Sequence, residues 1–175
     1  MDNFPSLTFD PNIEIRETAA TDPVNRTKPE NGPVHTSLRI YRVPRKFSFT
    51  LGLLTAQDKD LLVRFEDQKS KYGAVIFTWQ NFYEAYHAPA RIPTTAYLYG
   101  QIVRPATANG RSYRCTSAGT SGSGTPSWPT SINATVTDGT VTWRENTYQV
   151  RQTKPWTFEM IAPGYWSCEM ELEEA

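Results

Sequence analysis

Two segments far apart in the chain alternate apolar and polar residues with a period of two. In the first, between residues 46 and 53, the apolar positions are Phe47, Phe49, Leu51 and Leu53. In the second, between residues 166 and 173, they are Trp166, Cys168, Met170 and Leu172. Successive side chains of a strand point to opposite faces, so this pattern is typical of strands with one buried face. The two segments predict a sheet with one apolar face.

The residues after the first segment predict a helix and a second strand. Thr55 stands at an N-cap position, Asp58 follows three residues later, and a narrow apolar stripe runs to Phe65, before Gly73. This spacing predicts an amphipathic helix of about four turns. The next residues, "AVIFTW", form a short apolar, β-rich run, which favours a strand that is covered on both faces.

The composition changes near residue 95, where Gly, Ser, Thr and Pro become dominant. In "TVTDGTVTW", Asp138 and Gly139 stand between two Val/Thr alternations, a strong signal for a two-residue hairpin turn. With "RSYRCTS" as a third strand, residues 95–147 predict a small all-β module with a Ser/Gly loop at residues 117–125. The following residues predict two more strands around Pro163 and Gly164.

These segments divide the chain into a host domain and an insertion. Because insertions are tolerated at loop tips, we expect residues 95–147 to interrupt a host domain made of residues 1–94 and 148–175. Residues 1–36 are rich in Pro, Asn, Thr and Asp, and we expect them to form an extended arm. The predicted fold class is mainly β with one flanking α-helix.

Charge and composition exclude several classes of function. The chain has 18 Lys and Arg against 18 Asp and Glu, and no basic cluster with interleaved aromatic residues, so specific nucleic-acid binding is not expected. No run of about 18 apolar residues and no secretory signal pattern occur, which favours synthesis in a cytoplasm and no membrane insertion. Cys115 and Cys168 lie in segments of different character, which favours reduced thiols over a disulfide.

No residue pattern predicts catalysis, a cofactor or a metal. His35 and His87 lack the spacing of a zinc site, and Asp58 and Asp60 are better interpreted as charges that complement a helix N-terminus than as an acid/base pair. The segment "GTSGSG" lacks the Lys-Ser/Thr ending of a phosphate-binding loop. We therefore expect a protein that is not an enzyme.

Two sets of side chains are candidates for binding or assembly. Alternate acids on the last predicted strand could bind a hard cation, but more often form a solvated face or an interface; they are Glu169, Glu171 and Glu173. Aromatic residues of the small module could stack on sugar rings; the candidates are Tyr113, Trp128 and Trp143. For the aromatic set, the alternative interpretation is that these rings close the core of a module with few aliphatic residues.

A resemblance to bacteriophage proteins is carried by "RKFSFTLGLLTAQDKDLLVRFEDQKSKYGAVIFTW", the aromatic residues after it, and "YWSCEMELEEA". In this order they resemble the minor tail protein M and distal tail protein group of long-tailed phages. The inserted segment resembles a small module of phage tail and fibre proteins, through "YRCTSAGTSGSGTPSWPT" and "VTDGTVTW".

The resemblance implies a fold, a particle and partners. The host domain would be a tail-tube-like β-sandwich or split barrel, and the insertion an immunoglobulin-like or carbohydrate-binding-like module. Copies of the chain would form a ring, trimeric or hexameric, that joins the tail tube protein to the distal hub proteins in the virion. DNA would pass through the lumen, which we expect Glu169, Glu171 and Glu173 to line. The module would project outward and contact a host-surface glycan.

Two other functions remain open at this point. The first is a carbohydrate- or receptor-binding module for which the host domain is only an anchor. The second is a tail-completion or head-tail connector protein, because such proteins share related tube-like folds.

Overall fold

A computed structural model describes residues 2–7, 15–22, 24–27, 35–38 and 43–175. The chain divides into two compact units. We call the described residues of 15–76 together with 150–175 the sheet unit, and residues 2–7 together with 77–149 the loop-rich unit. Residues 77–94, which the sequence assigns to the host domain, thus lie in one unit with the Gly/Ser-rich segment.

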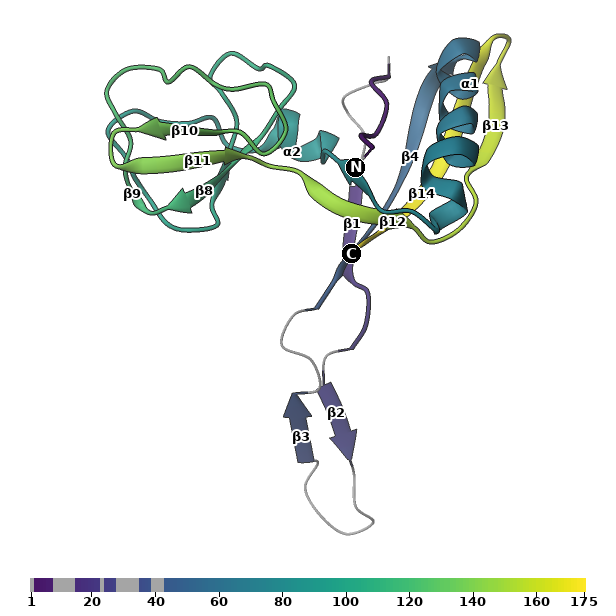
Figure 1. The fold of residues 1–175 in the computed structure, drawn as a ribbon, viewed down its shortest axis with the longest axis horizontal. Coiled ribbons are helices and arrows are strands. Elements are labelled where there is room, and N and C mark those ends of the chain that lie inside the picture. The colour runs from purple at the N-terminus through teal and green to yellow at the C-terminus, as the bar shows by residue number, and fades with distance from the viewer. Residues whose placement is uncertain (1, 8–14, 23, 28–34, 39–42) are drawn as a thin grey trace. The chain divides into compact units, whose positions relative to one another are not determined.

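The elements confirm a mainly β chain with one long helix (Figure 1). Those of the sheet unit are β1 (Ile15–Ala19), β2 (Val24–Thr27), β3 (His35–Leu38), β4 (Arg45–Thr55), α1 (Ala56–Phe65), a π-helical turn (Glu66–Ser70), a 3-10 turn (Lys71–Gly73), β13 (Thr157–Ala162) and β14 (Tyr165–Glu174). Those of the loop-rich unit are β5 (Phe77–Trp79), α2 (Phe82–His87), β6 (Ala96–Tyr97), β7 (Ile102–Val103), β8 (Tyr113–Ser117), β9 (Gly119–Thr120), β10 (Thr135–Asp138) and β11 (Val141–Glu145). Strand β12 (Tyr148–Gln152) begins in the loop-rich unit and ends in the sheet unit.

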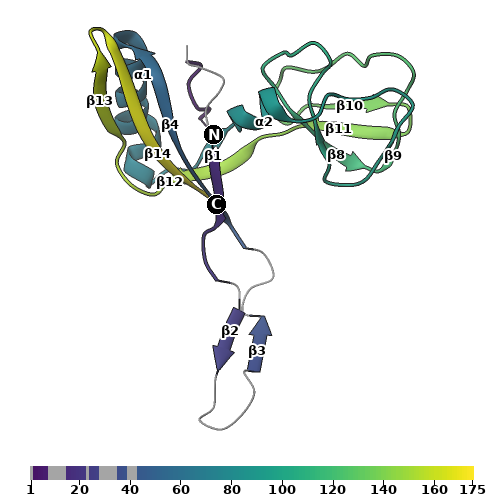
Figure 2. The same ribbon diagram turned by 180° about the vertical axis from the view of Figure 1, so that it is seen from behind.

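The two alternating segments pair with each other at the centre of the sheet unit. Strands β4 and β14 are antiparallel, with Phe49 opposite Met170 and Leu51 opposite Cys168. β1 pairs with the other side of β4, and β13 pairs with β14. Figure 2 shows α1 behind the β4–β14 pair. The apolar face of the sheet is buried, as the alternation predicts.

One apolar residue of the first alternating segment has the opposite orientation from the predicted one. Leu53 has φ +56° and is 53% exposed, whereas the next residue, Leu54, is fully buried. The register of β4 against β14 shifts at this point, because a β-bulge places an extra residue in β4. The prediction that Leu53 faces the core was therefore wrong, and Leu54 takes its place.

The predicted start of α1 is confirmed by its hydrogen bonds. The Thr55 hydroxyl accepts from the Asp58 N–H at 3.2 Å, and the Asp58 carboxylate accepts from the Thr55 N–H at 3.1 Å, which forms a capping box. Leu62 and Phe65 turn toward the interior, and Phe65 stacks on Trp156 at 6.2 Å between ring centroids. The right-handed helical path continues through the π-helical turn to Ser70 and ends there, because Lys71 and Tyr72 have φ +47° and +55°. The helix thus ends before Gly73, as predicted.

The loop-rich unit contains a four-stranded sheet in the order β10-β11-β8-β7 and a second pair, β6 and β9. The β10–β11 hairpin is confirmed, but its turn is Gly139–Thr140, because Asp138 already pairs with Val141. Of these two turn residues only Gly139 has a positive φ, as a type II′ hairpin requires.

Two other elements of the loop-rich unit, β5 and α2, differ from prediction. Only Phe77–Trp79 of the run "AVIFTW" forms a strand, although all three residues are buried as predicted. Helix α2 was not predicted at all. Its signal was Asn81, whose side chain accepts from the Glu84 N–H three residues later.

Both cysteines are reduced, as expected, and buried. Burial raises the pKa of the Cys115 thiol, and burial together with the charge of Glu66 raises that of Cys168 to about 12. Neither thiol is therefore positioned as a nucleophile. No helix in the described residues is both long and apolar enough to cross a bilayer.

Candidate assembly surface

The three candidate acids lie on the polar face of the β4–β14 pair. Glu169 is opposite Thr50, Glu171 is opposite Ser48, and Glu173 is opposite Lys46. Their neighbours Cys168, Met170 and Leu172 are fully buried on the other face. The alternating residues of β14 therefore lie on two different faces, one in the core and one at the surface. The three acids are on the surface face and point away from the core.

Basic side chains neutralise this face. Lys46 Nζ lies 2.7 Å from the Glu171 carboxylate, and Lys154 Nζ lies 2.7 Å from that of Glu169. The hydrogen bond from Lys46, together with one from Thr153, lowers the pKa of Glu171, and the bond to Glu169 raises the pKa of Lys154.

Glu173 completes a face of balanced charge, because it is opposite both Lys46 and Arg151 in the sheet register. The sequence does not indicate which side chains lie beside these acids. In the structure, β4 and the β12–β13 connection bring cations beside them from distant parts of the chain.

Strand β13 carries apolar side chains at an open edge of the sheet. It pairs only with β14 among the described strands, and five of its six residues are exposed. Met160 is 60% exposed and Ile161 is 50% exposed, and Tyr165 across the hairpin turn is 46% exposed. We call these three residues the edge patch. Exposed backbone and apolar side chains together make this edge suitable for pairing with another strand.

Strand β1 forms a second open edge. It pairs only with β4 among the described strands, in register from Ile15 opposite Phe49 to Ala19 opposite Arg45. All its residues except half-buried Ile15 are exposed. A sheet with two free edges can add a strand at either one.

The candidate sugar-binding rings lie mainly in the core of the loop-rich unit. Tyr113 and Trp143 are fully buried, and half-buried Trp128 packs against them, with its ring centroid 4.4 Å from that of Tyr113. The Tyr113 hydroxyl donates to the Pro129 carbonyl at 2.7 Å. The expectation that Tyr113 and Trp143 present a glycan surface was therefore wrong: their faces are covered by other core side chains, the alternative that the composition allowed.

A buried ion pair beneath this core was not recognised from the sequence. Arg91 binds both carboxylate oxygens of Asp138, with Nε 2.9 Å from Oδ2 and Nη2 2.6 Å from Oδ1. Trp143 Nε1 donates to Asp138 at 3.0 Å, and the Gly122 N–H donates at 2.9 Å. The Asp-Gly pattern identified a turn, but nothing local indicates a partner 47 residues away.

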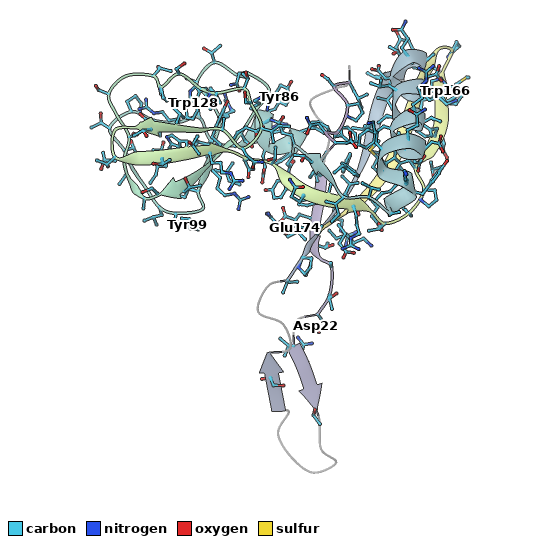
Figure 3. The ribbon with its side chains drawn as sticks, viewed as in Figure 1. Asp22, Tyr86, Tyr99, Trp128, Trp166 and Glu174 are labelled. Atoms are coloured by element: carbon cyan, nitrogen blue, oxygen red, sulfur yellow. The ribbon has the colours of Figure 1, made fainter. Side chains whose placement is uncertain are left out.

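The loop-rich unit also contains a cavity of about 450 Å³. Its aromatic lining is Phe4, Phe82 and Tyr86, and its charged lining is the pair Arg111–Glu145, whose Nη1 and Oε1 are 2.6 Å apart. Thr147 also lines it, and the Thr147 hydroxyl is buried without a hydrogen-bond partner among the described residues. Tyr86, which belongs to α2, is labelled in Figure 3.

No metal-binding group of three or more His, Cys, Asp or Glu residues occurs in the described parts of the chain. Neither a scan against models of protein families nor a search of curated proteins found a match to this chain.

Proposed function

We propose that this protein is a structural subunit of a phage tail tip, which forms a ring between the tail tube and the distal hub or baseplate. The observation that carries the proposal is the sheet unit with two open edges, one of which bears the edge patch. Because β13 and β1 differ in sequence, joining β13 of one copy to β1 of the next is a heterologous contact. Such contacts close into rings when the rotation between copies allows it.

The polar face of the sheet suits the wall of a DNA channel. In a ring closed through the sheet edges, one face of each sheet is turned toward the axis, and the face opposite α1 carries Glu169, Glu171 and Glu173 beside Lys46 and Lys154. Balanced charge offers passing phosphates no net attraction, because each lysine is held by a carboxylate. We place this face in the lumen on that basis.

We expect the substitution Met160→Lys to prevent the ring from forming. A charge on an edge strand opposes strand pairing, while the folded subunit is little affected because Met160 is 60% exposed. Mass photometry and negative-stain microscopy should show rings for the unmodified protein and monomers for the variant. Val63→Lys, at a 41% exposed position on α1, is the matched control and should leave the rings intact. Rings that persist in the Met160→Lys variant would contradict the use of this edge.

The position of the ring in the particle distinguishes a tail tip from a connector. Gold-labelled antibody against the protein should mark the distal end of the tail in virions. Labelling at the head-tail junction would instead support a tail-completion or connector protein.

A second candidate function is saccharide binding by the loop-rich unit. The cavity beside Tyr86 combines aromatic faces with a neutral charge pair and an unsatisfied hydroxyl, a combination that suits a neutral, hydroxyl-rich ring. This site is distinct from the buried Tyr113 and Trp143.

We expect Tyr86→Ala to weaken saccharide binding by about tenfold, which corresponds to about 1.4 kcal/mol. Calorimetry with sugars selected on a glycan array measures the effect. Tyr99→Ala is the control, because Tyr99 is 76% exposed but does not line the cavity. Absence of binding to any arrayed sugar would exclude this function.

A further inference from the structure

The cavity of the loop-rich unit presents a hydrogen-bond donor, because only one side chain of its ion pair is accessible. The Glu145 side chain is fully covered, and both of its carboxylate oxygens are occupied. Oε1 accepts from Arg111 Nη1 at 2.6 Å, and Oε2 accepts from the Asn133 N–H at 3.1 Å. Arg111 lines the cavity, and its side chain is 25% exposed. A ligand therefore reaches the guanidinium and not the carboxylate.

The guanidinium of Arg111 keeps donors for a ligand. An arginine side chain carries five N–H donors, and the bond to Glu145 is the only one that this side chain makes to the described residues. Because Glu145 already neutralises its charge, the group that suits Arg111 is a strong neutral acceptor. A carboxylate on the ligand would instead leave a negative charge without a counter-ion.

The Thr147 hydroxyl is a second polar group in the wall of this cavity. Its oxygen is buried and has no hydrogen-bond partner among the described residues, although a hydroxyl can both donate and accept. A buried polar group without a partner destabilises the fold, so a ligand that bonds to it is favoured. Apolar side chains of Phe82 and Ile132 line the same cavity.

We propose that the cavity binds an N-acetylated amino sugar and selects it through the acetamido group. The carbonyl oxygen of this group accepts from Arg111, its N–H donates to the Thr147 hydroxyl, and its methyl group packs against the apolar lining. A sugar with a hydroxyl in the same position has neither the carbonyl nor the methyl group. This inference rests on the proposed saccharide binding, to which it adds the class of sugar.

N-acetylglucosamine and glucose test the proposal, because they differ only in the group at one ring position. A hydrogen bond to a charged side chain predicts that N-acetylglucosamine binds about tenfold more tightly than glucose. Glucuronate adds a carboxylate and should bind no more tightly than glucose. Titration calorimetry of the full chain with each of the three sugars measures these affinities.

The variant Thr147→Val distinguishes a ligand-binding role of the hydroxyl from a structural one. Removal of an unpaired buried hydroxyl should raise the temperature at which the loop-rich unit unfolds, whereas the preference for N-acetylglucosamine over glucose should fall by about threefold. Thr116→Val is the matched control, because the Thr116 hydroxyl donates to the Thr142 carbonyl at 3.2 Å and does not line the cavity. This control should lower the unfolding temperature and leave the preference unchanged.

The variant Arg111→Lys tests the other half of the acetamido site. Lysine keeps a counter-ion for the buried Glu145, so the unit still folds, but it lacks the planar fork of donors. The preference for N-acetylglucosamine should therefore fall by about fivefold, while the affinity for glucose changes little. Tyr86→Ala should instead weaken both sugars equally, because an aromatic face is common to their binding.

The outcomes separate failure of this inference from failure of saccharide binding itself. Equal affinity for N-acetylglucosamine and glucose, or tighter binding of glucuronate, would overturn the acetamido site and leave saccharide binding in place. A preference that is unchanged in both Thr147→Val and Arg111→Lys would also overturn it. A protein that binds none of the arrayed sugars would overturn the saccharide function, and the inference with it.

Discussion

Replacement of Asp138 with alanine is expected to destabilise the loop-rich unit by about 3–5 kcal/mol, because it leaves Arg91 charged and buried without a counter-ion. The two side chains are only 3% and 5% exposed. Trp143 and Gly122 also lose the acceptor for their N–H groups. Hydrogen exchange read by mass spectrometry measures the loss, since it reports on each unit separately where a single melting curve does not.

Two controls isolate the buried charge. Asp22→Ala removes an ion pair with Arg26 in which both side chains are 56% exposed, and should leave the stability nearly unchanged because solvent screens this pair. The double variant Arg91→Met, Asp138→Leu replaces the buried pair with apolar groups, and should be more stable than Asp138→Ala alone. If Asp138→Ala and the double variant were destabilised equally, the loss could not be attributed to the unpaired buried charge of Arg91.

The same carboxylate gives the loop-rich unit a pH dependence on the acid side. Burial by itself raises the pKa of Asp138, but hydrogen bonds from Arg91, Trp143 and Gly122 outweigh it and hold that pKa below its ordinary value. A depressed native pKa stabilises the fold above the unfolded pKa of about 3.9, and this contribution is lost as the pH falls through the native value. The loss should therefore occur below about pH 4 and be absent from Asp138→Ala.

Substitution of Gly73 with alanine should destabilise the sheet unit by about 2–5 kcal/mol. Gly73 has φ +94°, and a Cβ at this position would lie 2.2 Å from the Gln152 carbonyl oxygen. Gln152 cannot easily move away, because its side chain accepts from the Ser70 hydroxyl at 2.7 Å and donates to buried Glu66. Both backbone strain and steric overlap therefore oppose the new methyl group.

Gly164→Ala separates these two causes. Gly164 lies in the β13–β14 turn with φ +82°, but an added Cβ there meets nothing within 4 Å. This variant should cost only the strain of a left-handed residue, about 1–2 kcal/mol. Urea unfolding followed through hydrogen exchange of α1 compares the two variants, and equal losses would exclude the overlap with Gln152.

Features that depend on a few neighbouring residues were predictable. The capping box of α1 needs only Thr55 and Asp58, and the buried face of β14 follows from alternation alone. Helix α2 also had a local signal at Asn81, which was overlooked.

Features that depend on distant partners were not predictable from local patterns. The β-bulge in β4 places Leu54 in the core instead of Leu53, and it arises from the pairing of β4 with β14. Of the candidate site residues, Tyr113 and Trp143 became core because the small module has few other large side chains to fill it.

The amino-acid sequence by itself determined the alternating strands, the capped helix and the hairpin turns, because each is set by side-chain period and backbone preference over a few residues. Only the tertiary structure decided which aromatic rings are buried, which cations neutralise the β14 acids, and which strand edges stay open. Those properties depend on packing between segments dozens of residues apart. The proposed ring is inferred from two of them, the open strand edges and the neutralised face of the sheet.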